Sequence, residues 1–307
     1  MSAATSGDSV RPEAPNAPTV LRILLGAQLR RLRESRGISA TEAAKAINGS
    51  ESKISRIELG RNSVREVDVA DLLDRYGVTD RAEREQLLNL ASQSNEHGWW
   101  RHYHDVLPTW FQAYLGLEES AQFIRSYEVQ FVPGLLQTEE YSQAVIELAA
   151  FPHESTERRV QLRQERQRRF AAGGVRLHAV IDEGALRRPV GSPDVMRLQL
   201  RHLMDLADEP GVTIQISPLR TGASHAAPGG FSILSFAAED LADVVYVELL
   251  TSALYLDKPS DVELYSEAME LIRSTSTKPE ETRRFLWSML TEHEELDSAV
   301  PVIASRP

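Results

Sequence analysis

The fold of the N-terminal region is decided by residues 25–61, LGAQLRRLRESRGISATEAAKAINGSESKISRIELGR. Leucines at positions 21, 25, 29 and 32 are spaced by four, four and three residues, which places them on one stripe of a helix. Gly37 is suited to the left-handed conformation that ends a helix. Ser39 and Glu42 have the spacing of a capping box, so a second helix is expected to run to about Ile47.

A third helix is expected after the turn Asn48-Gly49. Its features are the N-cap Ser50, the inward-facing Ile54 and Ile57, and the terminating Gly60. Helical spacing continues over residues 65–76 and 81–94, which makes five helices in all. Two short helices joined by a glycine-containing turn are typical of a helix-turn-helix.

The charge of the chain is unevenly distributed. The net charge is −11, but residues 22–65 carry ten Lys and Arg against four Asp and Glu. A basic module on an acidic body is typical of a protein that contacts DNA with one end. For one charge run alone, a solvated helix face is the competing interpretation.

The same stretch resembles the XRE type of helix-turn-helix found in lambda-repressor-like and Cro-like regulators, over about residues 24–78. The helix-one arginines, the glycine turn and the sequence ISRIELG occur together at the separations of that family. The resemblance implies that Arg33 pairs with Glu58 to tie the first helix to the third. Ala40 departs from the family, which usually has Gln at the start of the second helix.

A recognition helix lies in the major groove and presents its N-terminal side chains to base edges. We therefore expect base reading by Glu51, Ser52, Lys53 and Arg56, with Ser50 at the same helix start. Phosphate contacts, which fix register without reading sequence, are expected from Ser39, Thr41, Lys45, Arg61 and Asn62. A homodimer on two half-sites of double-stranded DNA is the expected assembly.

Composition excludes several other functions. The chain has no cysteine, so disulfides, zinc-thiolate sites and a cysteine nucleophile are excluded. A metal site would need His, Asp and Glu, and no metal-binding motif frames His97, His102 and His104, so no metal is expected. No cofactor is expected either. No run of about 18 apolar residues is present, so we expect a cytoplasmic protein that joins the nucleoid when bound to DNA, with no membrane partner. Residues 1–19 are rich in Ser, Ala and Pro and are expected to form a disordered tail.

The sequence predicts a DNA-binding domain at 20–95 and a regulatory or partner-binding domain at 96–307, which is helical over 96–171. A helix is expected near residues 118–127. Residues 158–169 hold six arginines, interpreted as an amphipathic helix packed on the body, with a second nucleic-acid surface as the alternative.

Residues 172–307 contain five short β-branched or aromatic runs separated by Gly, Pro and Asp, which is typical of strands: VRLHAVID, VTIQISPL, FSILSFA, DVVYVELL and ALYLD. Helices are expected over 192–206, 260–274 and 279–294. The fold class is therefore α+β, with an all-α five-helix N-terminal domain, a helical segment and an antiparallel-sheet domain.

This half resembles the WhiJ-like actinobacterial regulators through EVQFVPGLLQTEEY, ASHAAPGGFSILSF and DVVYVELLTSALYLD. The resemblance implies developmental or antitoxin-like regulation, often with a small partner protein encoded nearby. A small-molecule effector is the alternative signal, with His225 in the loop TGASHAAPGG as its candidate ligand-binding residue.

A DNA-targeted enzyme is the competing class for the large domain. The best candidate catalytic residues are Ser224-His225 and Asp182-Glu183, but no phosphate-binding loop, nucleophile elbow or metal-binding motif surrounds them. We expect no catalytic residue and no enzyme activity.

Overall fold

The computed structural model describes residues 18–60, 62–95, 98–148, 155–221, 229–237 and 242–299. These residues divide into two compact units, one formed mainly by residues up to 95 and the other by nearly all residues from 98 onward. The tail expected over 1–19 lies outside the described residues except for Pro18 and Thr19, which begin the first helix instead.

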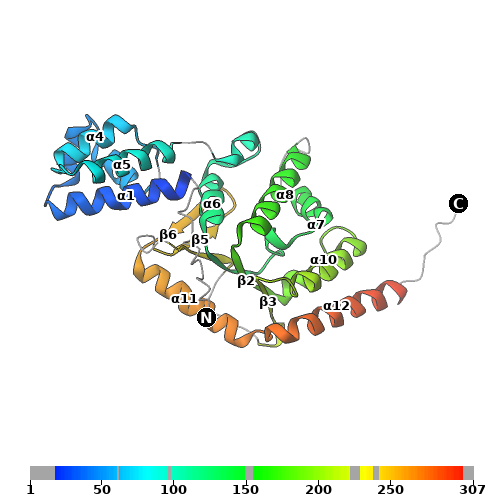
Figure 1. Ribbon diagram of the computed structural model, residues 1–307. Helices are drawn as coiled ribbons and strands as arrows, with labels where there is room; N and C mark the ends of the chain where they lie inside the picture. The colour runs from blue at the N-terminus through cyan, green and yellow to red at the C-terminus, as the bar shows by residue number, and fades with distance from the viewer. Residues whose placement is uncertain are drawn as a thin grey trace, which may run out of the picture. The chain divides into compact units, whose positions relative to one another are not determined.

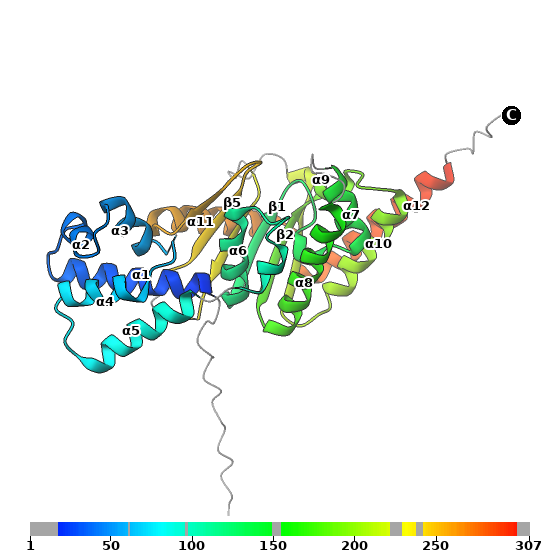
Figure 2. The ribbon, with the colours of Figure 1, turned by 90° about the horizontal axis from the view of Figure 1, so that it is seen from above.

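The first unit is all helical (Figure 2). Its helices are α1 (Pro18–Ser35), α2 (Ala40–Ala46), α3 (Glu51–Glu58), α4 (Glu66–Arg75) and α5 (Arg81–Ser94). They share one apolar core, to which α1 contributes Leu25 and Leu29 and α3 contributes Ile54 and Ile57. The five expected helices are confirmed, and Leu25, Leu29 and Leu32 of the leucine stripe face this core.

Local signals set the ends of these helices. The Ser39 hydroxyl accepts a hydrogen bond from the Glu42 amide, and the Glu42 carboxylate accepts one from the Ser39 amide, so the capping box is formed. Ser50 caps α3 through the Lys53 amide. The left-handed conformation of Gly37 (φ 64°) and Gly60 (φ 63°) allows the chain to leave α1 and α3.

The second unit begins with a short 3-10 helix, η1 (Trp99–Tyr103), and α6 (Thr109–Ser120). Strand β1 (Phe123–Glu128) follows, and then η2 (Gly134–Leu136), α7 (Glu139–Leu148) and α8 (Thr156–Gly173). The helix expected near 118–127 is wrong for most of its length, because α6 ends at Ser120 and residues 123–128 pair with two other strands.

The remaining strands are β2 (Arg176–Asp182), β3 (Val212–Ser217), β4 (Phe231–Ser235), β5 (Val244–Glu248) and β6 (Ala253–Leu256). They join β1 in one sheet of order β3-β2-β1-β4-β5-β6. Helices α9 (Glu183–Arg187), α10 (Pro193–Leu206), α11 (Pro259–Thr275) and α12 (Pro279–Ala299) complete the unit, and η4 (Leu219–Thr221) follows β3.

The α+β class is confirmed, but the sheet is mixed rather than antiparallel. Strands β4, β5 and β6 form the expected antiparallel hairpins, and β1 pairs antiparallel with β4. Strands β1 and β2, and β2 and β3, pair in parallel. The physical reason is the long helical connections between these strands, since a parallel pair requires a crossover segment.

The two faces of this sheet differ in chemistry. Helix α11 covers one face, where Tyr127, Val180, Ile233 and Val245 pack with Met269 and Ile272 in an apolar core (Figure 1). The other face lies under α6 and α8 and presents the alternate residues of each strand. Among them are Ser126, Ser232 and Tyr246, so this face is unusually polar for a buried one.

Candidate DNA-binding surface

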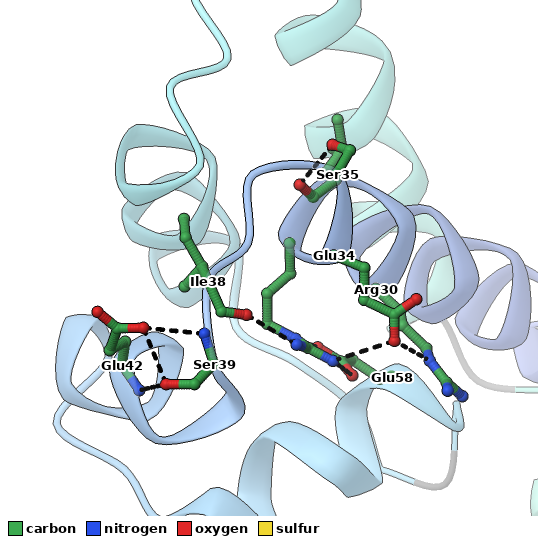
Figure 3. A network of polar contacts seen from close by, with 9 residues as sticks. Arg30, Glu34, Ser35, Ile38, Ser39, Glu42 and Glu58 are labelled. Atoms are coloured by element: carbon green, nitrogen blue, oxygen red, sulfur yellow. Dashed lines mark hydrogen bonds and ion pairs between the residues drawn. The ribbon is translucent and has the colours of Figure 1, made fainter.

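Helix α3 is held against α1 by a bidentate ion pair (Figure 3). The Arg33 guanidinium donates to both carboxylate oxygens of Glu58 at 2.6 and 2.9 Å, and also to the Ile38 carbonyl at 2.9 Å. The two side chains are only 12% and 8% exposed. The pair implied by the resemblance is therefore confirmed as a structural tie, and the Glu58 hydrogen bond raises the pKa of Arg33.

Close backbone contact reinforces this tie. A Cβ on Gly26 of α1 would lie 2.4 Å from the Ile57 carbonyl oxygen of α3. A Cβ on Gly60 would lie 2.7 Å from the Cα of Ile23. Glycine at these two positions therefore allows α1 and the end of α3 to approach within backbone contact, which sets the pose of α3.

Two of the side chains expected to read bases are engaged within the domain. Lys53 Nζ lies 2.9 Å from Oδ2 of Asp68. The Asp68 Oδ1 accepts a hydrogen bond from Arg65 at 2.5 Å. Burial opposes ionisation of Asp68, but the bonds from Arg65 and Lys53 lower its pKa below the usual range. Glu51 accepts a hydrogen bond from Thr41 at 3.2 Å, which links α3 to α2.

The exposed side chains that α3 leaves uncommitted are Ser52, Ser55 and Arg56. No hydrogen bond or ion pair joins them to the described part of the chain. Ser55 was not among the expected contacts, although it lies three residues after Ser52 on the helix and therefore shares its exposed side. This spacing of three residues could have identified Ser55 from the sequence as a further candidate for DNA contact.

The expected phosphate-contacting residues that the structure describes are all exposed: Ser39, Thr41, Lys45 and Asn62. Ser50, at the start of α3, is exposed as well. The hydroxyls of Ser39 and Thr41 already bond Glu42 and Glu51, so Lys45 and Asn62 are the less committed members. Arg61 lies outside the described residues.

The arginines of α8 are used inside the second unit. Arg158 pairs with Asp105, Arg169 with Glu119 and Glu165, and the buried Arg166 with Glu118 at 2.8 Å. Arg163 donates to Gln137, and Arg168 pairs with Glu165. This supports the amphipathic packed helix over a second nucleic-acid surface.

The enzyme candidates of the second unit have structural roles where they are described. Asp182 caps α9 through the Gly184 amide. Glu183 accepts from Arg187 and from the Leu219 amide. Ser224 and His225 lie outside the described residues. Across the described ranges, no group of three or more potential metal-ligating side chains is found, and no helix is long and apolar enough to cross a membrane.

Comparison with known protein families finds a helix-turn-helix domain at residues 24–87. It finds a second domain, described as a domain of unknown function (DUF5753), at residues 111–288. Neither a curated protein nor a solved structure matches the chain.

The fold of the first unit and this match define a DNA-binding helix-turn-helix regulator of transcription. The chain belongs to the DUF5753 family, whose domain covers more than half of its length.

Proposed function

We propose that α3 reads DNA sequence and that the second unit receives the signal that controls this binding. The observation that carries the proposal is the uncommitted, exposed trio Ser52, Ser55 and Arg56 on a helix whose pose is held by Arg33 and Glu58. Arg56 is suited to donate two hydrogen bonds to guanine, and the serines to bond either base edge. Lys45, Asn62 and Arg61 contact phosphates in this proposal.

The ion pair between Lys53 and Asp68 makes Lys53 less available than Arg56 for contacts with bases. A lysine already 2.9 Å from a carboxylate would have to exchange that ion pair for a base contact, whereas Arg56 has no such pair to lose. Glu51 is restrained similarly by Thr41. Arg56 is therefore the leading specificity residue, with Lys53 and Glu51 secondary.

The proposed assembly is a homodimer that places two α3 helices in successive major grooves, about 34–36 Å apart. The signal reaches the second unit as a small partner protein or a small-molecule effector, in an antitoxin-like arrangement similar to that of WhiJ-like regulators. For such a signal to act, the partner must bind the DNA-competent and incompetent states with different affinities.

The test is selection of bound duplexes from a random library by the full-length protein at physiological salt, followed by affinity measurement on the enriched site. We expect a palindromic site, and Arg56→Ala should lose about 1–3 kcal/mol of discrimination at one base pair per half-site. Arg81→Ala removes the same charge from an exposed position at the start of α5 and serves as the control. Equal affinity of the wild type for selected and random duplexes would refute sequence reading.

A further inference from the structure

A cavity of about 240 Å³ lies in the second unit, where η1, α6 and the end of α8 meet. The described residues that line it all belong to this unit, between positions 99 and 175. Two of them, at the end of α8, are exposed and form its rim: Ala172 and Gly173. The apolar lining residues are Trp99, Leu115, Phe170, Ala172, Gly173 and Val175.

The four charged residues of the lining form ion pairs with one another. Arg166 donates to both carboxylate oxygens of Glu118, at 2.9 and 2.8 Å, and the two side chains are only 9% and 8% exposed. Arg169 lies 3.1 Å from Glu119 and 2.9 Å from Glu165 of its own helix. A charged ligand would have to compete with these pairs, and a buried charge that loses its partner is costly. The lining therefore favours a neutral ligand.

One wall of the cavity is aromatic. The Arg169 guanidinium lies 4.7 Å from the centre of the Trp99 ring, and the Trp100 and Tyr103 rings meet that ring edge-on, so it is held in place. Phe170 adds a second ring to the lining. An aromatic ligand gains stacked or edge-to-face contacts with such rings, in addition to the burial of its own apolar surface. The wall therefore favours a ring system over an aliphatic ligand.

The volume of the cavity limits the size of its ligand. An apolar cavity of roughly 150 Å³ holds one benzene molecule. In proportion, 240 Å³ holds about nine or ten non-hydrogen atoms, which is the size of two fused rings.

We propose that this cavity binds a small neutral aromatic molecule of two fused rings. Such a ligand packs against Trp99 and Phe170 and leaves both ion pairs of the lining intact. The site deepens the proposed function, because it gives the second unit a class of ligand, and it rests on that proposal only for the role of this ligand as a signal. Binding is measured without DNA, so failure of the cavity to bind is distinguishable from failure of α3 to read sequence.

The test is a ligand-observed NMR titration of the full-length protein with indole. We expect one saturable site with a Kd of about 1 mM or below, as is reasonable for so small a probe. Cyclooctanol has as many non-hydrogen atoms as indole but no aromatic ring, and should bind roughly threefold to tenfold more weakly. Equal binding of cyclooctanol would refute the aromatic class.

A second set of probes tests the charge of the ligand. Indole-3-acetamide is neutral, indole-3-acetate has nearly the same shape with a negative charge, and tryptamine is a cation of similar size. We expect the acetamide to bind roughly tenfold or more tightly than either charged probe, because only the charged probes compete with the ion pairs. Equal binding of the three would refute the selection of a neutral ligand.

Two neighbouring positions of α8 provide matched variants. Ala172 lines the cavity and Ala171 does not, and both are exposed. Ala172→Leu places its side chain in the cavity and should weaken indole binding roughly tenfold or more, whereas Ala171→Leu should bind as the wild type does. Gly173→Leu fills the same space from the next position, where a Cβ would meet only Val175 Cγ2, at 3.7 Å, and it should also weaken binding. The absence of a saturable site, or equal binding by all three variants, would overturn the proposal.

Discussion

Removing one partner of the Arg33–Glu58 pair should destabilise the first unit strongly. The Arg33 side chain is 12% exposed in the wild type, and in Glu58→Ala it keeps only its bond to the Ile38 carbonyl and a more distant contact with Glu34. Breaking a buried pair in this way costs about 3–5 kcal/mol, and the slight access of both side chains favours the lower end, about 3 kcal/mol. The double replacement Arg33→Met with Glu58→Leu should recover most of this loss, because no charge is then left unpaired.

The measurement is amide hydrogen exchange of α1 and α3 by mass spectrometry in the full-length protein. Tryptophans are found only at positions 99, 100, 110 and 287, so fluorescence does not report on the first unit. Exchange gives the free energy of local opening directly. The control is Glu34→Ala, which breaks the exposed pair with Arg30 (56% and 52% exposed) and should cost below about 1 kcal/mol. If Glu58→Ala costs no more than this control, or if the double variant loses the sum of both single changes, the reasoning is wrong.

Three further outcomes follow from the described geometry. Gly26→Ala should destabilise the first unit by about 1–3 kcal/mol in the same exchange assay, because the new methyl meets a backbone carbonyl at 2.4 Å and the gain in helix propensity is smaller. Ser39→Ala should cost about 1 kcal/mol in α2, since it removes the capping hydroxyl; unchanged exchange of α2 would contradict the role of the capping box. The raised pKa of Glu128, about 8 against an ordinary 4.5, means that ionisation opposes folding as pH rises through this window. Glu128→Gln should therefore raise the melting temperature relative to wild type at pH about 9 and lose this gain near pH 5, whereas Glu267→Gln should show no such trend.

The residues that determined each part of the fold acted over different distances along the chain. Helices α1, α2 and α3 follow from signals within a few residues: the leucine stripe, the Ser39 and Glu42 capping box, and glycines at the helix ends. The existence of β2 to β6 follows in the same way, from short apolar runs broken by Gly, Pro and Asp. These features were predictable because each depends on the conformational preference of neighbouring residues.

Contacts between distant residues decided the rest. Residues 123–128 have apolar spacing compatible with a helix, and only pairing with β2 and β4 makes them a strand. The sequence predicts that Lys53 reads bases, but in the structure its ammonium group forms an ion pair with Asp68, fifteen positions away. The pairing of Ser126 in β1 with Ser232 in β4 joins strands that are more than one hundred residues apart. Hydrogen bonding across a sheet and ion pairing across a core depend on which segments meet in space, and a pattern of neighbours along the chain does not contain that information.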